Sequence, residues 1–303
     1  MYEQFFNLKM KPFELVPNPS FLYLSKTHKR AFRYLQYGIR EKAGFILLTG
    51  EVGSGKTTLI SDLIKQIARN VTLAKVFNTR VNSEQLFAII NEDFGLDSRG
   101  KDKVTLIKEL NDFLIQQHAR RNHTVLIIDE AQNLHSDLLE EIRMLSNLET
   151  DTSKLLQIVL VGQPELRETL SMPGMRQLRQ RISINCHLYP LTKDETYEYI
   201  LHRLEVAGNK NAVSFEGDSL DAIFLYCKGI PRLTNIMCDF LLLAAFNEEI
   251  RKIDSTMVHD IAKDLDFENN YWGKHQDAQK QPTQKPGVDY TALLNALRIQ
   301  NME

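Results

Sequence analysis

The stretch GEVGSGKT at residues 50–57 constrains the fold more than any other part of the chain. It lies between the apolar run GFILLT and the helix-like TLISDLIKQIA. Backbone N–H groups of such a loop point inward at a phosphate, and glycines permit the close approach and the backbone angles that this requires. The dipole of the following helix also favours an anion. The predicted phosphate-binding residues are Gly50, Gly53, Ser54, Gly55, Lys56, Thr57 and Thr58.

The same stretch fits the pattern G-x-x-x-x-G-K-[ST], which assigns two side chains. Lys56 is expected to reach the β- and γ-phosphates, and Thr57 to bind Mg²⁺. A glycine-rich turn without a ligand is the alternative, and the strand before the loop and the helix after it argue against that alternative. The sequence therefore predicts ATP and Mg²⁺ as cofactors.

Apolar runs alternate with helical patterns from residue 44 to about 190. Nearly all-apolar runs are typical of strands buried on both faces, and helices between them predict a parallel sheet of the α/β class. The pattern from 191 to about 266 is helical and predicts a second, smaller domain. The expected units are 1–190 (nucleotide binding), 191–266 (helical lid) and 267–303 (linker and short helix). The expected strands are 44–50, 71–78, 124–130, 156–162 and 182–188.

Polar residues follow two of these strands. TVLIIDE ends in Asp129 and Glu130, and a carboxylate there can hold the water shell of Mg²⁺ beside Thr57. The second carboxylate, Glu130, can polarise a water molecule towards the γ-phosphate. LQIVLVG is followed by Gln163, which is expected near that water if the two strands are neighbours. The Asp-Glu pair favours hydrolysis over nucleotide binding alone.

Two arginine-bearing stretches follow. MRQLRQRI contains Arg176, Arg179 and Arg181. An arginine from such a stretch can reach the γ-phosphate of a neighbouring subunit, and Arg181 is the first choice for that role. In GIPR, Arg232 comes at a helix start, where a cation is disfavoured, and this predicts an anionic partner.

Composition excludes few functions. The formal net charge is −2, which argues against a generally basic nucleic-acid binder. No apolar run is long enough to cross a membrane, and the N-terminus lacks the features of a secretory signal. Cys186, Cys227 and Cys238 form no CxxC pair and are expected to be reduced core residues of a cytoplasmic protein.

The C-terminal part changes character after Trp272. Residues 273–287 are polar and are expected to form a flexible linker. In 289–299, Tyr290, Leu293, Leu294 and Leu297 follow a helical spacing. This short helix is interpreted either as a docking peptide or as a tail that packs on its own domain.

GEVGSGKT, LIIDEAQNL, LVGQPEL, LRQRI and GIPR, in this order, resemble an AAA+ ATPase. The resemblance covers residues 1–266 and is greatest to the ExeA/GspA-type general secretion pathway ATPases. It extends to ATPases of exosortase, exopolysaccharide and MSHA pilus loci. Members of the secretion group continue into a transmembrane helix and a peptidoglycan-binding domain. Neither is expected here, so any envelope role would require recruitment at the inner face of the cytoplasmic membrane.

The resemblance implies a sheet of order 5-1-4-3-2, a helical lid and an ATP-dependent homo-oligomer, either ring or filament. It makes Asp129 the Walker B metal residue, Glu130 the catalytic base, Gln163 sensor 1 and Arg232 sensor 2. Arg181 or Arg179 becomes the arginine finger. It further implies that Asn78 orients Glu130, and that residues around Pro17-Asn18 and Tyr37-Gly38-Ile39 line the adenine pocket.

Three functions remain open from the sequence. The first is an ATPase that powers or regulates a secretion, polysaccharide-export or pilus system, with the 289–299 helix as a docking element. The second is a DNA-associated ATPase that resembles the Mu B and TnsC transposition regulators, with HKRAFR (28–33) and HARRNH (118–123) as phosphate contacts. The third is a nucleotide-dependent switch whose hydrolysis only resets partner binding.

Overall fold

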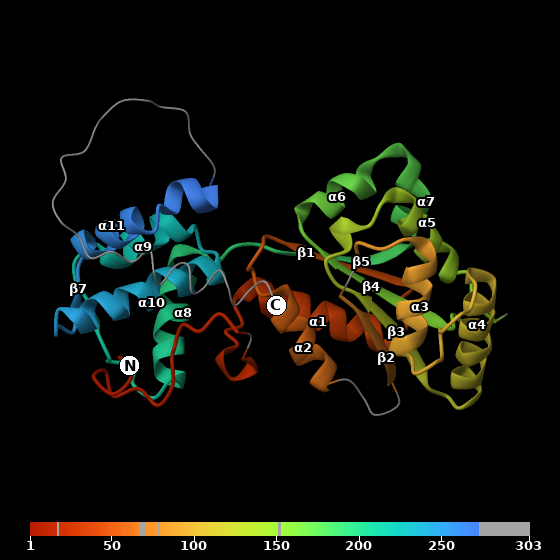
Figure 1. Cartoon of the computed structure of the whole chain (residues 1–303), viewed down its shortest axis with the longest axis horizontal. Helices are drawn as coiled ribbons and strands as arrows, with labels where there is room; N and C mark the ends of the chain where they lie inside the picture. The colour runs from red at the N-terminus through yellow and green to blue at the C-terminus, as the bar shows by residue number, and fades with distance from the viewer. Residues whose placement is uncertain (17, 67–70, 78, 151–152, 273–303) are drawn as a thin grey trace.

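A five-stranded parallel sheet forms the centre of the larger part of the molecule (Figure 1). The structure is a computed structural model that describes residues 1–272 except 17, 67–70, 78 and 151–152. Pro17, Asn78 and the predicted helix at 289–299 therefore lie outside the described residues. The strand order β2-β3-β4-β1-β5 confirms the predicted 5-1-4-3-2. The strands are β1 (Phe45–Gly50), β2 (Val71–Val76), β3 (His123–Ile128), β4 (Leu156–Gly162) and β5 (Ile182–Leu188).

Helices cover both faces of the sheet, and this explains why the strands are apolar throughout. Alternate residues of β1 pack into different clusters, with Ile46 and Leu48 on one side and Phe45 and Leu47 on the other. One face is covered by α1 (Lys26–Arg40) and α2 (Lys56–Gln66). The other face is covered by α3 (Ser83–Asp93), α4 (Lys103–Ala119), α5 (Ser136–Leu145), α6 (Pro164–Ser171) and α7 (Arg176–Arg181).

A second, helical part has its own core and lies beside the sheet (Figure 1). It contains a pair of parallel two-residue strands, β6 (Ser214–Phe215) and β7 (Lys252–Ile253), which the helix-only prediction missed. Strands of two residues carry too little periodicity to be recognised in a sequence. The helices are α8 (Lys193–Val206), α9 (Ser219–Cys227), α10 (Pro231–Asn247) and α11 (Ser255–Asp264).

The N-terminal arm, defined here as residues 1–16 and 18–24, packs with this helical part. Its buried side chains Tyr2, Phe6, Leu8, Phe13 and Phe21 belong to the helical core. The sequence predicted that the arm belongs to the nucleotide-binding domain. In the structure, the apolar side chains of the arm instead share a core with the helical part, about two hundred residues further along the chain. The short helix η1 (Pro19–Phe21) ends the arm before α1 begins.

The helical core also continues beyond residue 266. Phe267 is buried in it, and the short helix η4 (Glu268–Trp272) follows. The indole Nε1 of Trp272 donates to the carbonyl of Tyr226 at 2.8 Å. Within residues 1–272, leaving aside the gaps given above, no helix is long and apolar enough to cross a membrane.

Candidate nucleotide-binding and catalytic site

The phosphate loop connects β1 to α2 as predicted. Gly53 and Gly55 have φ of +76° and +94°, values that L side chains rarely adopt. Lys56 begins α2, and its Nζ donates to the carbonyls of Gly50 at 2.8 Å and Glu51 at 3.0 Å. Burial lowers the pKa of this ammonium, and the nearby carboxylates oppose that shift. The loop thus places the partly desolvated ammonium of Lys56 beside the free N–H groups at the start of α2, where a phosphate can bind.

Two oxygen ligands suited to Mg²⁺ lie side by side at the loop. Thr57 Oγ1 donates to Asp129 Oδ2 at 3.2 Å, although the two residues come from different elements. Mg²⁺ is usually held by one or two protein oxygens together with phosphate oxygens and water, so this pair fits the ion. Lys75 Nζ lies 3.8 Å from the same Asp129 oxygen, an adjacent cation that the sequence did not predict.

Glu130 is the second residue after β3 and adopts the left-handed conformation, with φ of 53°. Non-glycine residues adopt this conformation rarely, and it often marks a functional position. The Glu130 carboxylate accepts from Gln132 Nε2 at 2.6 Å and from Gln163 Nε2 at 3.2 Å. Gln132 also accepts from the backbone N–H of Gln163 at 3.0 Å. The structure therefore brings together the predicted pair Glu130 and Gln163.

Gln132 is a site residue that sequence reasoning missed. It occupies the LIIDEAQNL segment, and its amide bridges the ends of β3 and β4. A side chain at residue 162 would interfere with it, because a Cβ on Gly162 would lie 3.0 Å from Gln132 Oε1. The predicted orienting residue, Asn78, lies outside the described residues, so its role stays a prediction.

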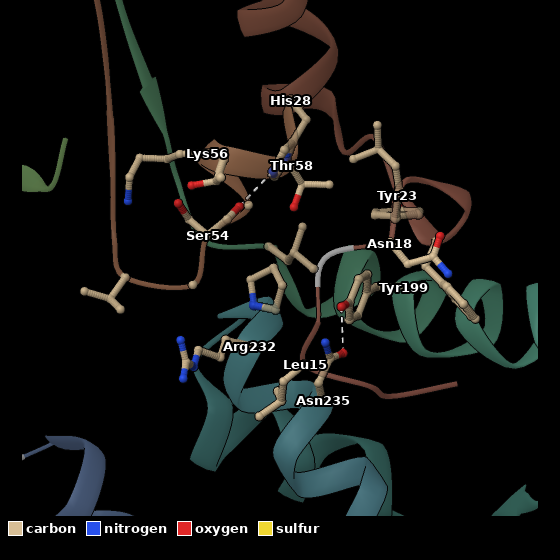
Figure 2. A pocket seen from close by; sticks show the side chains of 18 of the residues that line it. Leu15, Asn18, Tyr23, His28, Ser54, Lys56, Thr58, Tyr199, Arg232 and Asn235 are labelled. Atoms are coloured by element: carbon tan, nitrogen blue, oxygen red, sulfur yellow. Dashed lines mark hydrogen bonds between the residues drawn. The ribbon is translucent and has the colours of Figure 1, made fainter. Parts of the chain in front are cut away.

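Helix α10 reaches the phosphate loop from the helical part. The backbone N–H of Arg232 donates to the carbonyl of Gly53 at 3.3 Å. A Cβ on Gly53 would lie 2.4 Å from Arg232 Cβ, so glycine is required there by contact as well as by its φ. Figure 2 shows the Arg232 side chain below the loop that carries Ser54. The predicted sensor 2 residue therefore lies at the phosphate site, while its role stays a prediction.

His28 is a second unpredicted residue of the site. It is buried on α1, and its Nε2 lies 2.9 Å from the carbonyl of Ser54 (Figure 2). A carbonyl only accepts, so Nε2 carries the proton, and Nδ1 accepts from the Ser25 hydroxyl at 2.7 Å. Burial lowers the pKa of the ring and favours this neutral form. The sequence placed His28 in a DNA-contact stretch; the structure uses it to hold the phosphate loop.

The cleft next to the loop is closed by the N-terminal arm and the helical part. Tyr37 and Ile39, predicted near the adenine, line a different cavity at the other end of α1, and that prediction was wrong. Helix α1 is about four turns long, so its two ends lie on opposite edges of the sheet. The arm and helical residues lining the cleft include Leu15, Val16, Asn18, Phe21, Tyr23, Tyr199, Arg203, Arg232 and Asn235.

Arg179 and Arg181 lie outside this cleft. Arg181 precedes Ile182, which pairs with Phe45 at the opposite end of β1 from Gly50. Arg181 Nη1 donates to the carbonyl of Arg143 at 3.3 Å, and Arg179 Nη1 to that of Leu170 at 2.8 Å. Neither arginine can serve the nucleotide of its own chain, which leaves action on a neighbouring subunit as their predicted role.

Comparisons with known proteins agree with this geometry. Residues 39–170 match the family described as AAA domain. General secretion pathway protein A of Aeromonas hydrophila is 42% identical over 254 residues, which are 84% of this chain and 46% of that protein. The chain thus spans about half the length of this curated relative.

Solved structures with low identity share the fold. The Cdc6p structure from Pyrobaculum aerophilum has a TM-score of 0.61 at 19% identity over 84% of this chain and 70% of that one. The ORC2 structure from Aeropyrum pernix has a TM-score of 0.58 at 18% identity, over 84% of this chain and 71% of that one. On this evidence, residues 39–170 match the AAA domain, and the chain as a whole is similar to general secretion pathway protein A.

Proposed function

We propose that this chain hydrolyses ATP in a Mg²⁺-dependent reaction in which Glu130 is the general base. The observation that supports this most strongly is the Glu130 carboxylate, fixed by Gln132 and Gln163 at the end of β3. It adjoins the Thr57–Asp129 pair, because Asp129 directly precedes Glu130 at the end of β3 and Thr57 donates to Asp129 from α2. Pocket-lining residues Lys56, Glu130 and Gln163 share one cleft.

Each side chain has a defined task in this proposal. Glu130 accepts a proton from the attacking water, and the amide of Gln163 holds that water or the γ-phosphate by hydrogen bonding. Lys56 leaves its carbonyl partners and neutralises charge on the β- and γ-phosphates. Mg²⁺, when held by Thr57 with Asp129, supplies further charge neutralisation on the phosphate oxygens.

Phosphate release from ATP tests the assignment. The wild-type chain is expected to turn over ATP only with Mg²⁺ present. Thr57→Ala is expected to raise the Mg²⁺ concentration needed for half-maximal turnover, because it removes one of two protein oxygens. Equal turnover in excess EDTA and in Mg²⁺ would contradict the metal assignment.

We further propose that the chain acts as a homo-oligomer, with Arg181 or Arg179 completing the site of a neighbour. The support is their position at the far edge of the sheet and the family resemblance. Turnover per subunit should then rise with protein concentration, and Arg181→Ala should remove that rise. Turnover per subunit that does not depend on protein concentration would count against Arg181 or Arg179 acting on a neighbouring subunit.

The cellular role that we propose is to power or regulate a secretion, polysaccharide-export or pilus system from the cytoplasmic side. The support is the identity to general secretion pathway protein A. Envelope recruitment through residues 289–299 is part of this proposal. Deleting 273–303 should abolish recruitment to membranes while ATP turnover persists, and unchanged recruitment would exclude that role for the segment.

A DNA-associated role is the second candidate, and one observation favours it. Arg33 of the first basic stretch and His123 of the second line one cavity, together with Arg40 and Lys42. ATP turnover with and without duplex DNA separates the candidates, with Glu130→Gln as the blank. DNA stimulation that disappears at high salt would favour this role. Turnover that does not respond to DNA would favour the envelope role.

A further inference from the structure

Three buried polar side chains in the helical part form a hydrogen-bonded relay that ends in the nucleotide cleft. Arg203 Nη1 donates to the Tyr199 hydroxyl oxygen at 2.9 Å. The Tyr199 hydroxyl donates to Asn235 Oδ1 at 2.7 Å (Figure 2). All three side chains line the cleft, and none is used by the phosphate chemistry described above.

The direction of this relay is fixed by chemistry. A guanidinium has no acceptor, so Arg203 can only donate, and the Tyr199 oxygen must accept from it. The Tyr199 proton is then directed to Asn235, whose carbonyl oxygen is the only acceptor of that amide. Consequently the Asn235 oxygen is engaged, and its NH₂ group remains as the donor.

Arg203 is itself held firmly. It is 7% exposed, and its remaining N–H groups donate to the carbonyls of Pro12 and Glu14 in the N-terminal arm. Its guanidinium also stacks over the Phe21 ring at 4.7 Å. Such a residue cannot turn to another partner without exposing buried carbonyls, so the relay keeps its direction.

The Asn235 NH₂ group has no partner within the described part of the chain, although the residue is only 6% exposed. Asn235 lines the cleft and its amide nitrogen is not fully enclosed, so the NH₂ group faces the space in which a bound ligand can supply an acceptor. Asn235 follows Arg232 by three residues on α10, so the two side chains lie on the same face of that helix. Arg232 is at the phosphate loop, and Asn235 is one turn further along the cleft.

The cleft changes character along this direction. Its phosphate end carries the loop glycines and Lys56, whereas its other end is lined by Leu15, Val16, Phe21 and Leu22 of the arm. Apolar and aromatic side chains suit the flat base and the sugar, and they do not suit phosphates. The end at Asn235 is therefore the place for the nucleoside half of the ligand.

We propose that Asn235 donates an amide hydrogen bond to an acceptor atom of the bound nucleoside, and that Arg203 and Tyr199 fix it as a donor. This inference rests on the proposed ATP site and adds a specificity-determining residue to it. Tripolyphosphate, which has no nucleoside, serves as the probe that separates the two halves of the cleft.

The experiment measures the dissociation constants of ATP and tripolyphosphate for the full chain by calorimetry, at high salt. Asn235→Leu removes the donor without adding charge and should weaken ATP about ten-fold while tripolyphosphate affinity stays unchanged. Asn235→Asp, which keeps the acceptor for Tyr199, should weaken ATP at least as much. The matched control is Asn247→Asp, an exposed residue on the same helix, which should change neither constant.

Tyr199→Phe tests the relay itself. It should weaken ATP by a smaller factor, about three-fold, and should add nothing to Asn235→Leu in the double variant. Unchanged ATP affinity in Asn235→Leu, or equal losses for ATP and tripolyphosphate, would overturn the inference. Absence of ATP binding by the wild-type chain would instead overturn the proposed function, and the inference with it.

Discussion

The two sides of the nucleotide cleft are built differently. The sheet side takes its residues from loops that directly follow β1, β3 and β4, and the strand register places them together. The helical side takes its residues from the arm and from α8 and α10, where Arg203 bonds to Pro12 across 191 positions. The sheet side can therefore be recognised in short stretches of sequence, whereas the helical side depends on tertiary packing.

The two sides are also physically connected. The backbone N–H of Lys26 on α1 donates to Glu195 at 3.0 Å, and Glu195 belongs to the capping box of α8. His28, two residues further along α1, holds the phosphate loop through Ser54. Movement of the helical part is thus expected to reach the loop through α1 as well as through the nucleotide.

The largest expected effect is on the sheet side. Glu130→Gln should lower ATP turnover by about 10²–10⁴-fold, because an amide cannot accept the proton of the attacking water. ATP affinity should change little. Phosphate release and calorimetry measure the two quantities, and Glu168→Gln, at an exposed position of α6, is the matched control. If Glu130→Gln retained the turnover of the wild-type chain, the general base would not be Glu130 on the sheet side.

The next effect tests the arm. Phe13 is 2% exposed in the helical core, so Phe13→Ala should lower the free energy of unfolding by about 3–5 kcal/mol. Phe77, which is 60% exposed, offers a control, and Phe77→Ala should have a much smaller effect. Denaturant unfolding followed by circular dichroism measures both. Equal effects in the two variants would show that the arm is not part of the core.

The contact between the two sides can be broken at one glycine. Gly53→Ala adds a Cβ that meets Arg232 Cβ and strains a backbone at φ +76°, so ATP affinity should fall about thirty-fold. Gly217→Ala, also at positive φ but outside the cleft and with open space around it, is the control for a glycine substitution elsewhere and should leave ATP affinity unchanged. Equal ATP affinities in the two variants would contradict the contact.

The smallest effect concerns a residue remote from the cleft. Burial, with a smaller contribution from Lys42, lowers the pKa of His123 to about 4. The unfolded chain binds this proton below about pH 6.5, so His123 contributes stability that is lost as the pH falls from about 6.5 to about 4. His123→Gln should reduce that loss by about 2 kcal/mol. Denaturant unfolding at pH 7 and pH 4.5 gives the free energy of unfolding of both chains. The same decrease between these pH values in both chains would contradict the role given to His123.

The positions of the candidate site residues could be predicted from the sequence where chemistry and local structure coincide. The loop at 50–57, Asp129, Glu130 and Gln163 each directly follow an apolar strand, and the strand order then brings their ends to one edge of the sheet. Gln132 was missed because a glutamine in a polar loop has no distinctive spacing. Its position between Glu130 and Gln163 appears only once β3 and β4 are paired.

The helical side could not be predicted in the same way. Tyr199 and Arg203 are spaced i, i+4 on α8, which also describes an ordinary solvent-facing pair. Both are buried because the arm covers them. No local sequence pattern predicts the contact between residues 12 and 203. The spacing of Asn235 three residues after Arg232 was the one signal available in the sequence.

Hydrogen exchange of the full chain, with and without ADP, tests most directly whether one nucleotide engages both sides. If one nucleotide contacts both sides, ADP should slow exchange in three segments together: the phosphate loop, the arm around residues 12–23 and the start of α10 at 231–237. Protection confined to the phosphate loop would contradict it, because the helical side would then take no part in binding.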